Sequence, residues 1–184
     1  MIPNFITLFR ILAAPFFAYF IAKNKFANFV PSVIFVSIYT LTAFTDKFDG
    51  TIARKYNINS NLGKCIDPIA DKIFVSTILL ALVYVQKAWL VTVALIMTRE
   101  FVIAGLREFA ALSKGLTVEV TGMAKLKTGL QMTAIGTLIF FNKGSTMLML
   151  ANVLLAVATF VSLLTMVQYI AFAHKKHIFN TKNK

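Results

Sequence analysis

The sequence predicts an all-α integral membrane protein with six transmembrane helices, and three observations support this fold class. Apolar residues make up 58% of the 184 residues, and the mean hydropathy is +0.76. Soluble domains contain only roughly 45–50% apolar residues. The apolar residues also occur in long runs separated by short polar turns, and a membrane span needs about 20 residues. Six such spans occupy the chain, so residues 1–184 are expected to form a single integral-membrane domain.

Six apolar runs define the expected spans in order along the chain. They cover residues 5–22, 29–54, 66–86, 88–112, 122–141 and 146–173. The first follows Pro3-Asn4, which can start a helix, and it carries Arg10 well inside, where a charge is expensive. The second ends in a charged stretch that includes Gly50, a residue that costs about 1 kcal/mol of helix propensity. A glycine at this position indicates that the backbone comes close to another group.

The remaining spans differ in the charges that they carry. The third begins with Asp67-Pro68, as expected for a first helical turn, in which proline is favoured. The fourth contains Arg99 and Arg107, which are eight residues apart and therefore share one helix face. The fifth opens with Lys125 and Lys127. The sixth is uniformly apolar and is expected to be scaffold.

The net charge of +12 comes from 19 basic and 7 acidic residues. The basic residues cluster at the ends of the expected spans, so an anionic membrane surface is the expected partner and a nucleic acid is not. With the N-terminus inside, four lysines fall in the outer turns, and the other 15 basic residues fall on or toward the cytosolic half. The four are Lys23, Lys25, Lys87 and Lys143. Both termini are therefore expected in the cytosol.

All four aspartates of the chain fall within 26 residues, in two pairs. Asp46 and Asp49 are spaced i, i+3, and Asp67 and Asp71 are spaced i, i+4, so each pair shares a face if its segment is helical. Four carboxylates packed together repel one another unless divalent cations neutralise them. Hard oxygen ligands suit Mg²⁺, Mn²⁺ or Ca²⁺ rather than Zn²⁺. The two pairs therefore predict a metal site at the ends of two membrane helices.

The residues around these aspartates resemble a family signature. Residues 46–54 read Asp-x-x-Asp-Gly-x-x-Ala-Arg, and after eight further residues, 63–71 read Gly-x-x-x-Asp-x-x-x-Asp. This is the pattern of the CDP-alcohol phosphatidyltransferases. Other stretches are similar to the bacterial phosphatidylglycerophosphate synthases within that family: Asn4-x-x-Thr7-x-x-Arg10, Arg99-Glu100, Leu106-Arg107-Glu108 and Lys125-x-Lys127-Thr128-x-x-Gln131. Those synthases usually carry glycine where this chain has Ala124.

The resemblance implies the CDP-alcohol phosphotransferase fold, a homodimer in the bacterial cytoplasmic membrane, and an active site facing the cytosol. It implies that a phosphatidyl group moves from CDP-diacylglycerol to an alcohol and that CMP is released. Two divalent cations, Mg²⁺ or Mn²⁺, would be held by Asp46, Asp49, Asp67 and Asp71, and would clamp the diphosphate. Asp71 would also act as the general base. The expected CDP-lipid-binding residues are Thr7, Gly50, Ala53, Arg54 and Gly63.

The acceptor is expected from a surplus of cationic residues. Arg10, Arg99, Arg107, Lys125 and Lys127 form a set larger than CMP release needs. Arginine suits bidentate recognition of phosphate, so glycerol-3-phosphate fits better than serine or choline. Inositol phosphate, glycerol and phosphatidylglycerol stay open as acceptors. It also stays open whether some of these cations contact only the phosphates of membrane lipids.

Two other classes of membrane protein also bind divalent cations through aspartates. Membrane prenyltransferases bind a lipid diphosphate in this way, but they are usually longer and lack Gly50, Ala53, Arg54 and Gly63 at this spacing. A divalent-cation channel or transporter should carry carboxylates along a route across the bilayer, whereas here all four are expected on one side. A CMP-release assay separates both classes from a phosphatidyltransferase.

Overall fold

The secondary structure in the computed structural model is α-helical, and the residues that the model describes contain no β-strand. These residues are 2–24, 33, 36, 37, 39, 61–114 and 122–175, and side chains at several helix ends are not among the described atoms. The helices are α1 (Ile2–Asn24), α3 (Asn61–Tyr84), α4 (Leu90–Lys114), α5 (Gly122–Phe140) and α6 (Thr146–Lys175). Residues 33, 36, 37 and 39 are helical as well. The prediction of an all-α protein is confirmed.

The helix bounds follow the apolar runs closely, with one clear difference. The third span was expected to begin at residue 66, but α3 already begins at Asn61. The interpretation of Pro68 as a first-turn residue is therefore wrong, because Pro68 follows seven residues of helix. A proline inside a helix forgoes one backbone hydrogen bond and does not have to end the helix. Leu62 and Lys64 have good helix propensity but Asn61 and Gly63 do not, so propensity alone does not explain the earlier start.

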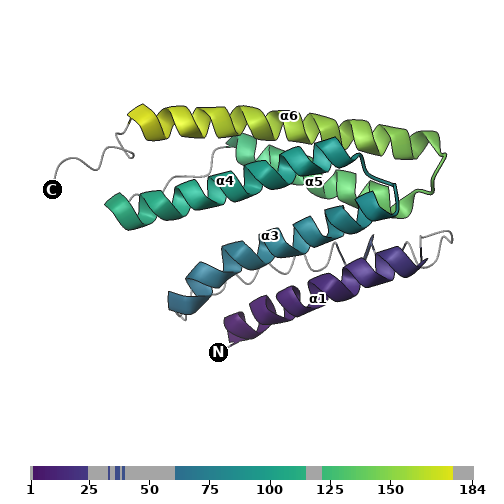
Figure 1. The fold of residues 1–184 in the computed structure, drawn as a ribbon, viewed down its shortest axis with the longest axis horizontal. Helices are drawn as coiled ribbons and strands as arrows, with labels where there is room; N and C mark the ends of the chain where they lie inside the picture. Colours follow the sequence, from purple (N-terminus) through teal and green to yellow (C-terminus); the bar gives the residue numbers. More distant parts are fainter. Residues whose placement is uncertain are drawn as a thin grey trace.

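The helices lie side by side along a common direction (Figure 1). α1 packs against α3, and α6 packs against both α4 and α5, while α3 contacts α4 and α5. α3 therefore links the α1 side of the bundle to the other three helices. The turns at residues 85–89 and 141–145 lie at one end of the bundle, and the start of α1 and the end of α6 lie at the other (Figure 1).

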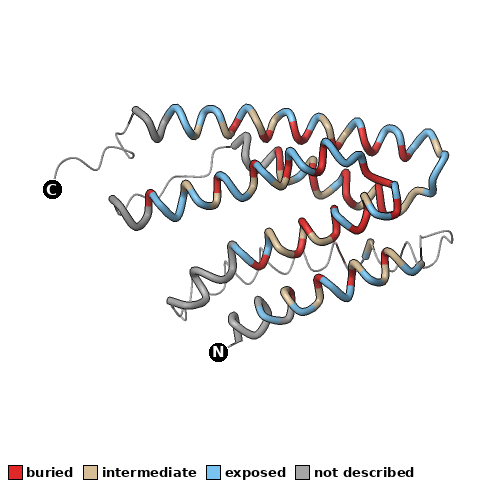
Figure 2. Tube along the Cα trace, in the orientation of Figure 1, coloured by how far each residue is buried: buried red, intermediate tan, exposed pale blue. Residues whose placement is uncertain are grey.

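The core lies where the helices face one another (Figure 2). The ring of Phe74 packs edge-on against Phe17 with centroids 5.4 Å apart, and it stacks on Tyr39 with centroids 6.4 Å apart. Fully buried aliphatic side chains continue this core between α3, α5 and α6: Ile78, Leu82, Ile135, Leu138 and Leu155. Helix packing inside a membrane depends on such close contacts, because lipid tails are as apolar as the core.

The outward faces of α1, α4 and α6 are apolar as well. Exposed side chains on them include Leu12, Phe16, Phe101, Val157 and Phe160. A helix that is apolar on all sides is typical of a membrane span. Among the described helices, one stretch is both long and apolar enough to cross a bilayer, Thr146–Ala171 in α6, with a mean hydropathy of 2.4. The six-span arrangement stays a prediction.

A buried amide holds the turn between α3 and α4 against α6. The Asn152 side chain donates hydrogen bonds to the carbonyls of Lys87 (2.9 Å) and Leu148 (3.0 Å), and accepts one from the Trp89 backbone N–H (3.0 Å). Lys87 is only 2% exposed, and its ammonium donates to the Ile139 carbonyl at the end of α5. Burial lowers the pKa of Lys87 to about 8. These contacts fix α3, α4, α5 and α6 relative to one another at this end of the bundle.

Candidate active site

A pocket lies between α3, α4 and α5. Its polar lining consists of Tyr39, Asp71, Lys72, Ser76, Glu100, Lys127, Thr128 and Gln131, and its apolar lining of Val75, Leu79, Ile96, Met132 and Ile135. Each helix contributes side chains at a spacing of about four residues, as expected for one helix face turned toward the pocket. The pocket thus places a carboxylate of α3, a carboxylate of α4 and an ammonium group of α5 around one space.

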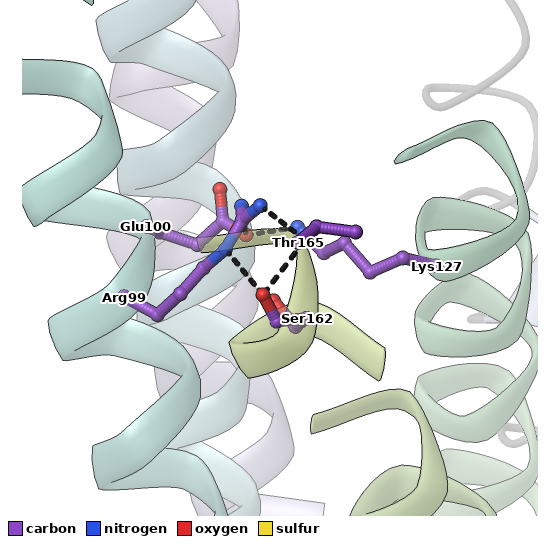
Figure 3. A network of polar contacts seen from close by, with 5 residues as sticks. All are labelled: Arg99, Glu100, Lys127, Ser162 and Thr165. Atoms are coloured by element: carbon purple, nitrogen blue, oxygen red, sulfur yellow. Dashed lines mark hydrogen bonds and ion pairs between the residues drawn. The ribbon is translucent and has the colours of Figure 1, made fainter. Parts of the chain in front are cut away.

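A polar network joins α4, α5 and α6 beside this pocket (Figure 3). Arg99 donates from Nη1 to the Glu100 carboxylate (3.0 Å), from Nε to the Ser162 carbonyl (3.1 Å) and from Nη2 to the Thr165 hydroxyl (2.9 Å). Lys127 donates to the same Glu100 oxygen from the α5 side. Glu100 therefore holds two cations, one on its own helix and one on α5.

The network balances charges that burial would otherwise make expensive. The side chains of Arg99 and Lys127 are 6% and 8% exposed, and that of Glu100 is 20% exposed. Buried ions are tolerated when they are paired and their remaining polar groups are hydrogen-bonded. Two cations share one carboxylate, so the network keeps a net positive charge at the edge of the pocket. Such a charge favours an anionic ligand.

The two arginines of α4 both contact α6. Arg99 reaches Ser162 and Thr165, and the Arg107 guanidinium lies 5.8 Å from the centre of the Tyr169 ring. They therefore share a helix face, as their spacing predicted. Both arginines were expected to bind the acceptor phosphate, and their described contacts are with α6 and Glu100. Lys127 lines the same pocket as Asp71.

Asp71 is the member of the predicted metal-binding set whose side chain is described. It is exposed toward the pocket, and it acts electrostatically on Tyr39 and Lys127. α3 is continuous through residues 67 and 71, so the helical spacing assumed for that pair is present. A carboxylate at this position fits a hard divalent cation. No cluster of three or more His, Cys, Asp or Glu side chains occurs within the described part of the chain.

The other predicted site residues are described to different extents. Arg10 is 5% exposed and lies on the same face of α1 as Ala14, Phe17 and Ile21, which are buried, so it stays within the bundle. Thr7, Gly63, Asp67 and Lys125 lie in helices, but their side chains are not described. Asp46, Asp49, Gly50, Ala53 and Arg54 lie outside the described residues.

Several pocket residues had received no role from the sequence, among them Glu100 and Tyr39. Glu100 had been noted only as a neighbour of Arg99, although a carboxylate in a membrane helix needs a partner. Tyr39 had not been noted at all. The available signal was its position seven residues before Asp46, a spacing that corresponds to one face if the segment is helical.

Comparisons with known proteins extend the similarity beyond these residues. A family model described as CDP-alcohol phosphatidyltransferase matches residues 1–173. Relatives from Rickettsia typhi, Wigglesworthia glossinidia brevipalpis and Salmonella paratyphi A are 40%, 37% and 34% identical to the chain. The matches cover 91%, 94% and 94% of this chain and 94% of each relative. All three relatives are named CDP-diacylglycerol--glycerol-3-phosphate 3-phosphatidyltransferase.

Proposed function

The chain belongs to the CDP-alcohol phosphatidyltransferase family, and from this membership we propose that it transfers the phosphatidyl group of CDP-diacylglycerol to glycerol-3-phosphate, forming phosphatidylglycerophosphate and releasing CMP. One observation supports the choice of acceptor. Relatives that are 34–40% identical over most of the chain carry a name that describes this reaction. The pocket supports the choice, because it combines a carboxylate with a buried cation.

Asp71 is the proposed base. Its carboxylate lines the pocket, where an acceptor hydroxyl has room to approach. Asp71 takes the proton of that hydroxyl while the hydroxyl oxygen forms a bond to the phosphatidyl phosphorus. The bond from this phosphorus to the bridging oxygen of the diphosphate breaks, and CMP leaves with the electron pair.

The aspartates also make up the proposed cofactor site. Asp46, Asp49, Asp67 and Asp71 would hold two divalent cations, Mg²⁺ or Mn²⁺, whose charge would neutralise the diphosphate. The helical spacing of residues 67 and 71 supports this assignment. CDP-diacylglycerol would approach the backbone at Gly50, Ala53 and Gly63, with Arg54 and Thr7 beside its charged headgroup. Gly50, Ala53 and Gly63 are small enough to leave room for cytidine and its phosphates.

Lys127 is the best-supported acceptor residue. It is buried at the pocket wall, and its ammonium group donates a hydrogen bond to Glu100. The net positive charge of this network favours an anion there. Arg99 directs its described hydrogen bonds to Glu100, Ser162 and Thr165, so it supports the acceptor site chiefly by holding Glu100. The other proposed contributors to acceptor phosphate binding are Arg10, Arg107 and Lys125.

The reaction is best tested by CMP release from purified protein in mixed micelles with CDP-diacylglycerol and Mg²⁺. Glycerol-3-phosphate, glycerol, inositol phosphate and phosphatidylglycerol are supplied in turn. Charge-assisted hydrogen bonds contribute about 1.5–3 kcal/mol, so kcat/KM for glycerol-3-phosphate should exceed that for glycerol by about 10–100-fold. Equal or greater turnover with glycerol refutes the acceptor. An absence of CMP release with every acceptor refutes transfer to any of these four alcohols.

For the membrane arrangement, we propose residues 1–184 as one domain of six spans in the bacterial cytoplasmic membrane, with both termini and the active site on the cytosolic side. The turns that contain Lys87 and Lys143 lie at the opposite end of the bundle from the start of α1 and the end of α6, which supports this orientation (Figure 1). The protein is also proposed to be a homodimer, which its mass in detergent would test. A monomeric mass would exclude that assembly.

Cysteine labelling tests this orientation in intact cells. In a Cys65→Ser background, Lys143→Cys should react with a membrane-impermeant maleimide, whereas Glu108→Cys should react only after the cells are permeabilised. Both positions are exposed, and they lie in the α5–α6 turn and in the last two turns of α4, at opposite ends of the bundle. The reverse pattern of labelling would place the active site on the outer face and contradict the topology.

A further inference from the structure

Tyr39 is a buried pocket residue whose polar group the mechanism above does not use. The residue is 3% exposed, and its hydroxyl has no hydrogen-bond partner among the described residues. A buried hydroxyl without a partner is costly, so such groups usually bond to a ligand or an ordered water. Because Tyr39 lines the pocket, a ligand bound there can supply the missing partner.

The phenol ring is held in place by the core. It stacks on Phe74 with an interplanar angle of 11°, and Phe74 packs edge-on against Phe17 of α1 at 74°. Packing on that side limits the movement of the ring, and Tyr39 lines the pocket. Asp71 lines the same pocket. Tyr39 is therefore placed beside the proposed base.

The charges around the pocket decide which part of a ligand meets Tyr39. The charged lining residues are Asp71, Lys72, Glu100 and Lys127, and Glu100 pairs with Lys127. The Asp71 carboxylate disfavours a phosphate close to the phenol, whereas Lys127 on α5 favours one. An acceptor with a phosphate near Lys127 and a reacting hydroxyl near Asp71 leaves its uncharged middle for the phenol. In glycerol-3-phosphate, the polar group at that position is the C2 hydroxyl.

We propose that Tyr39 determines acceptor specificity by donating a hydrogen bond from its hydroxyl to the C2 hydroxyl of glycerol-3-phosphate. The inference rests on the proposed function. It adds to that function a side chain, Tyr39, that recognises a hydroxyl group of the acceptor rather than its phosphate. It separates glycerol-3-phosphate from phosphorylated alcohols of the same length that lack the middle hydroxyl.

The test compares two acceptors in two enzymes. The acceptors are glycerol-3-phosphate and 3-hydroxypropyl phosphate, which lacks only the C2 hydroxyl, and the enzymes are wild type and Tyr39→Phe. Loss of a neutral hydrogen bond is expected to raise the KM for glycerol-3-phosphate about threefold to tenfold, with the KM for CDP-diacylglycerol unchanged. Kinetics with 3-hydroxypropyl phosphate should stay the same, so the preference for glycerol-3-phosphate shrinks by the same factor. Tyr84→Phe, at a position 75% exposed at the end of α3, is the matched control and should behave as wild type.

Each outcome has a distinct meaning. An unchanged preference in active Tyr39→Phe overturns the inference alone, as does an equal loss with both acceptors. If Tyr39→Phe is too unstable to assay, the wild type alone can still overturn the inference. Equal kcat/KM for the two acceptors would mean that the enzyme does not recognise the C2 hydroxyl. Wild-type protein that releases no CMP with glycerol-3-phosphate overturns the proposed function and the inference together.

Discussion

Asp71→Asn is expected to lower CMP release by about 10²–10⁴-fold or more while CDP-diacylglycerol binding stays closer to that of the wild type. Asparagine keeps the size of the side chain and one carbonyl oxygen, but it loses the negative charge and the basicity. The side chain faces the pocket, where the acceptor hydroxyl must give up its proton. The measurement is kcat for CMP release beside CDP-diacylglycerol affinity at saturating Mg²⁺.

Two matched variants show whether this loss is specific to the base. Asp46→Asn and Asp67→Asn are expected to weaken the metal site and, with it, the binding of CDP-diacylglycerol. Asp71→Asn that loses binding as severely as these two is better described as a fourth metal ligand. Near-normal turnover in Asp71→Asn would contradict the mechanism.

Lys127→Met is expected to raise the KM for glycerol-3-phosphate by about 10–100-fold, the equivalent of a charge-assisted contact of about 1.5–3 kcal/mol. The variant keeps most of the length of the side chain and removes the ammonium group that meets Glu100 at the pocket. Glu100 keeps its ion pair with Arg99, so the loss of thermal stability should be moderate.

Glu100→Gln is the informative counterpart of Lys127→Met. It should lower thermal stability more than Lys127→Met does, and raise the KM for glycerol-3-phosphate less. It leaves the cations of Arg99 and Lys127 close together without their shared carboxylate. Breaking a buried pair costs about 3–5 kcal/mol, so this variant should be the less stable of the two. The KM for glycerol-3-phosphate should rise less than in Lys127→Met, since the cation for the phosphate is still present. A greater rise in KM for Glu100→Gln would mean that Lys127 acts only through the network.

Local sequence patterns determined the helices and the candidate chemistry. Apolar runs predicted the positions of α1, α4, α5 and α6 closely, because the length of a helix in an apolar surrounding follows from its own residues. The eight-residue separation of Arg99 and Arg107 predicted a shared face, and both contact α6. The spacing of Asp67 and Asp71 required a helix, which α3 provides. Polarity alone misplaced the start of α3, which begins at Asn61, before the expected span.

Only the tertiary structure decided which of these residues meet. Arg99 bonds to a carbonyl 63 residues away, Lys127 reaches Glu100 across 27 residues, and the pocket brings Tyr39 beside Asp71. None of these contacts follows from the period of one helix, because each depends on how two or three helices pack. In a membrane, hydrophobicity does not select one packing over another, since core and lipid are equally apolar. Shape and interhelical polar contacts make that selection, so the sequence determined the helices and the reacting groups, whereas packing determined the site.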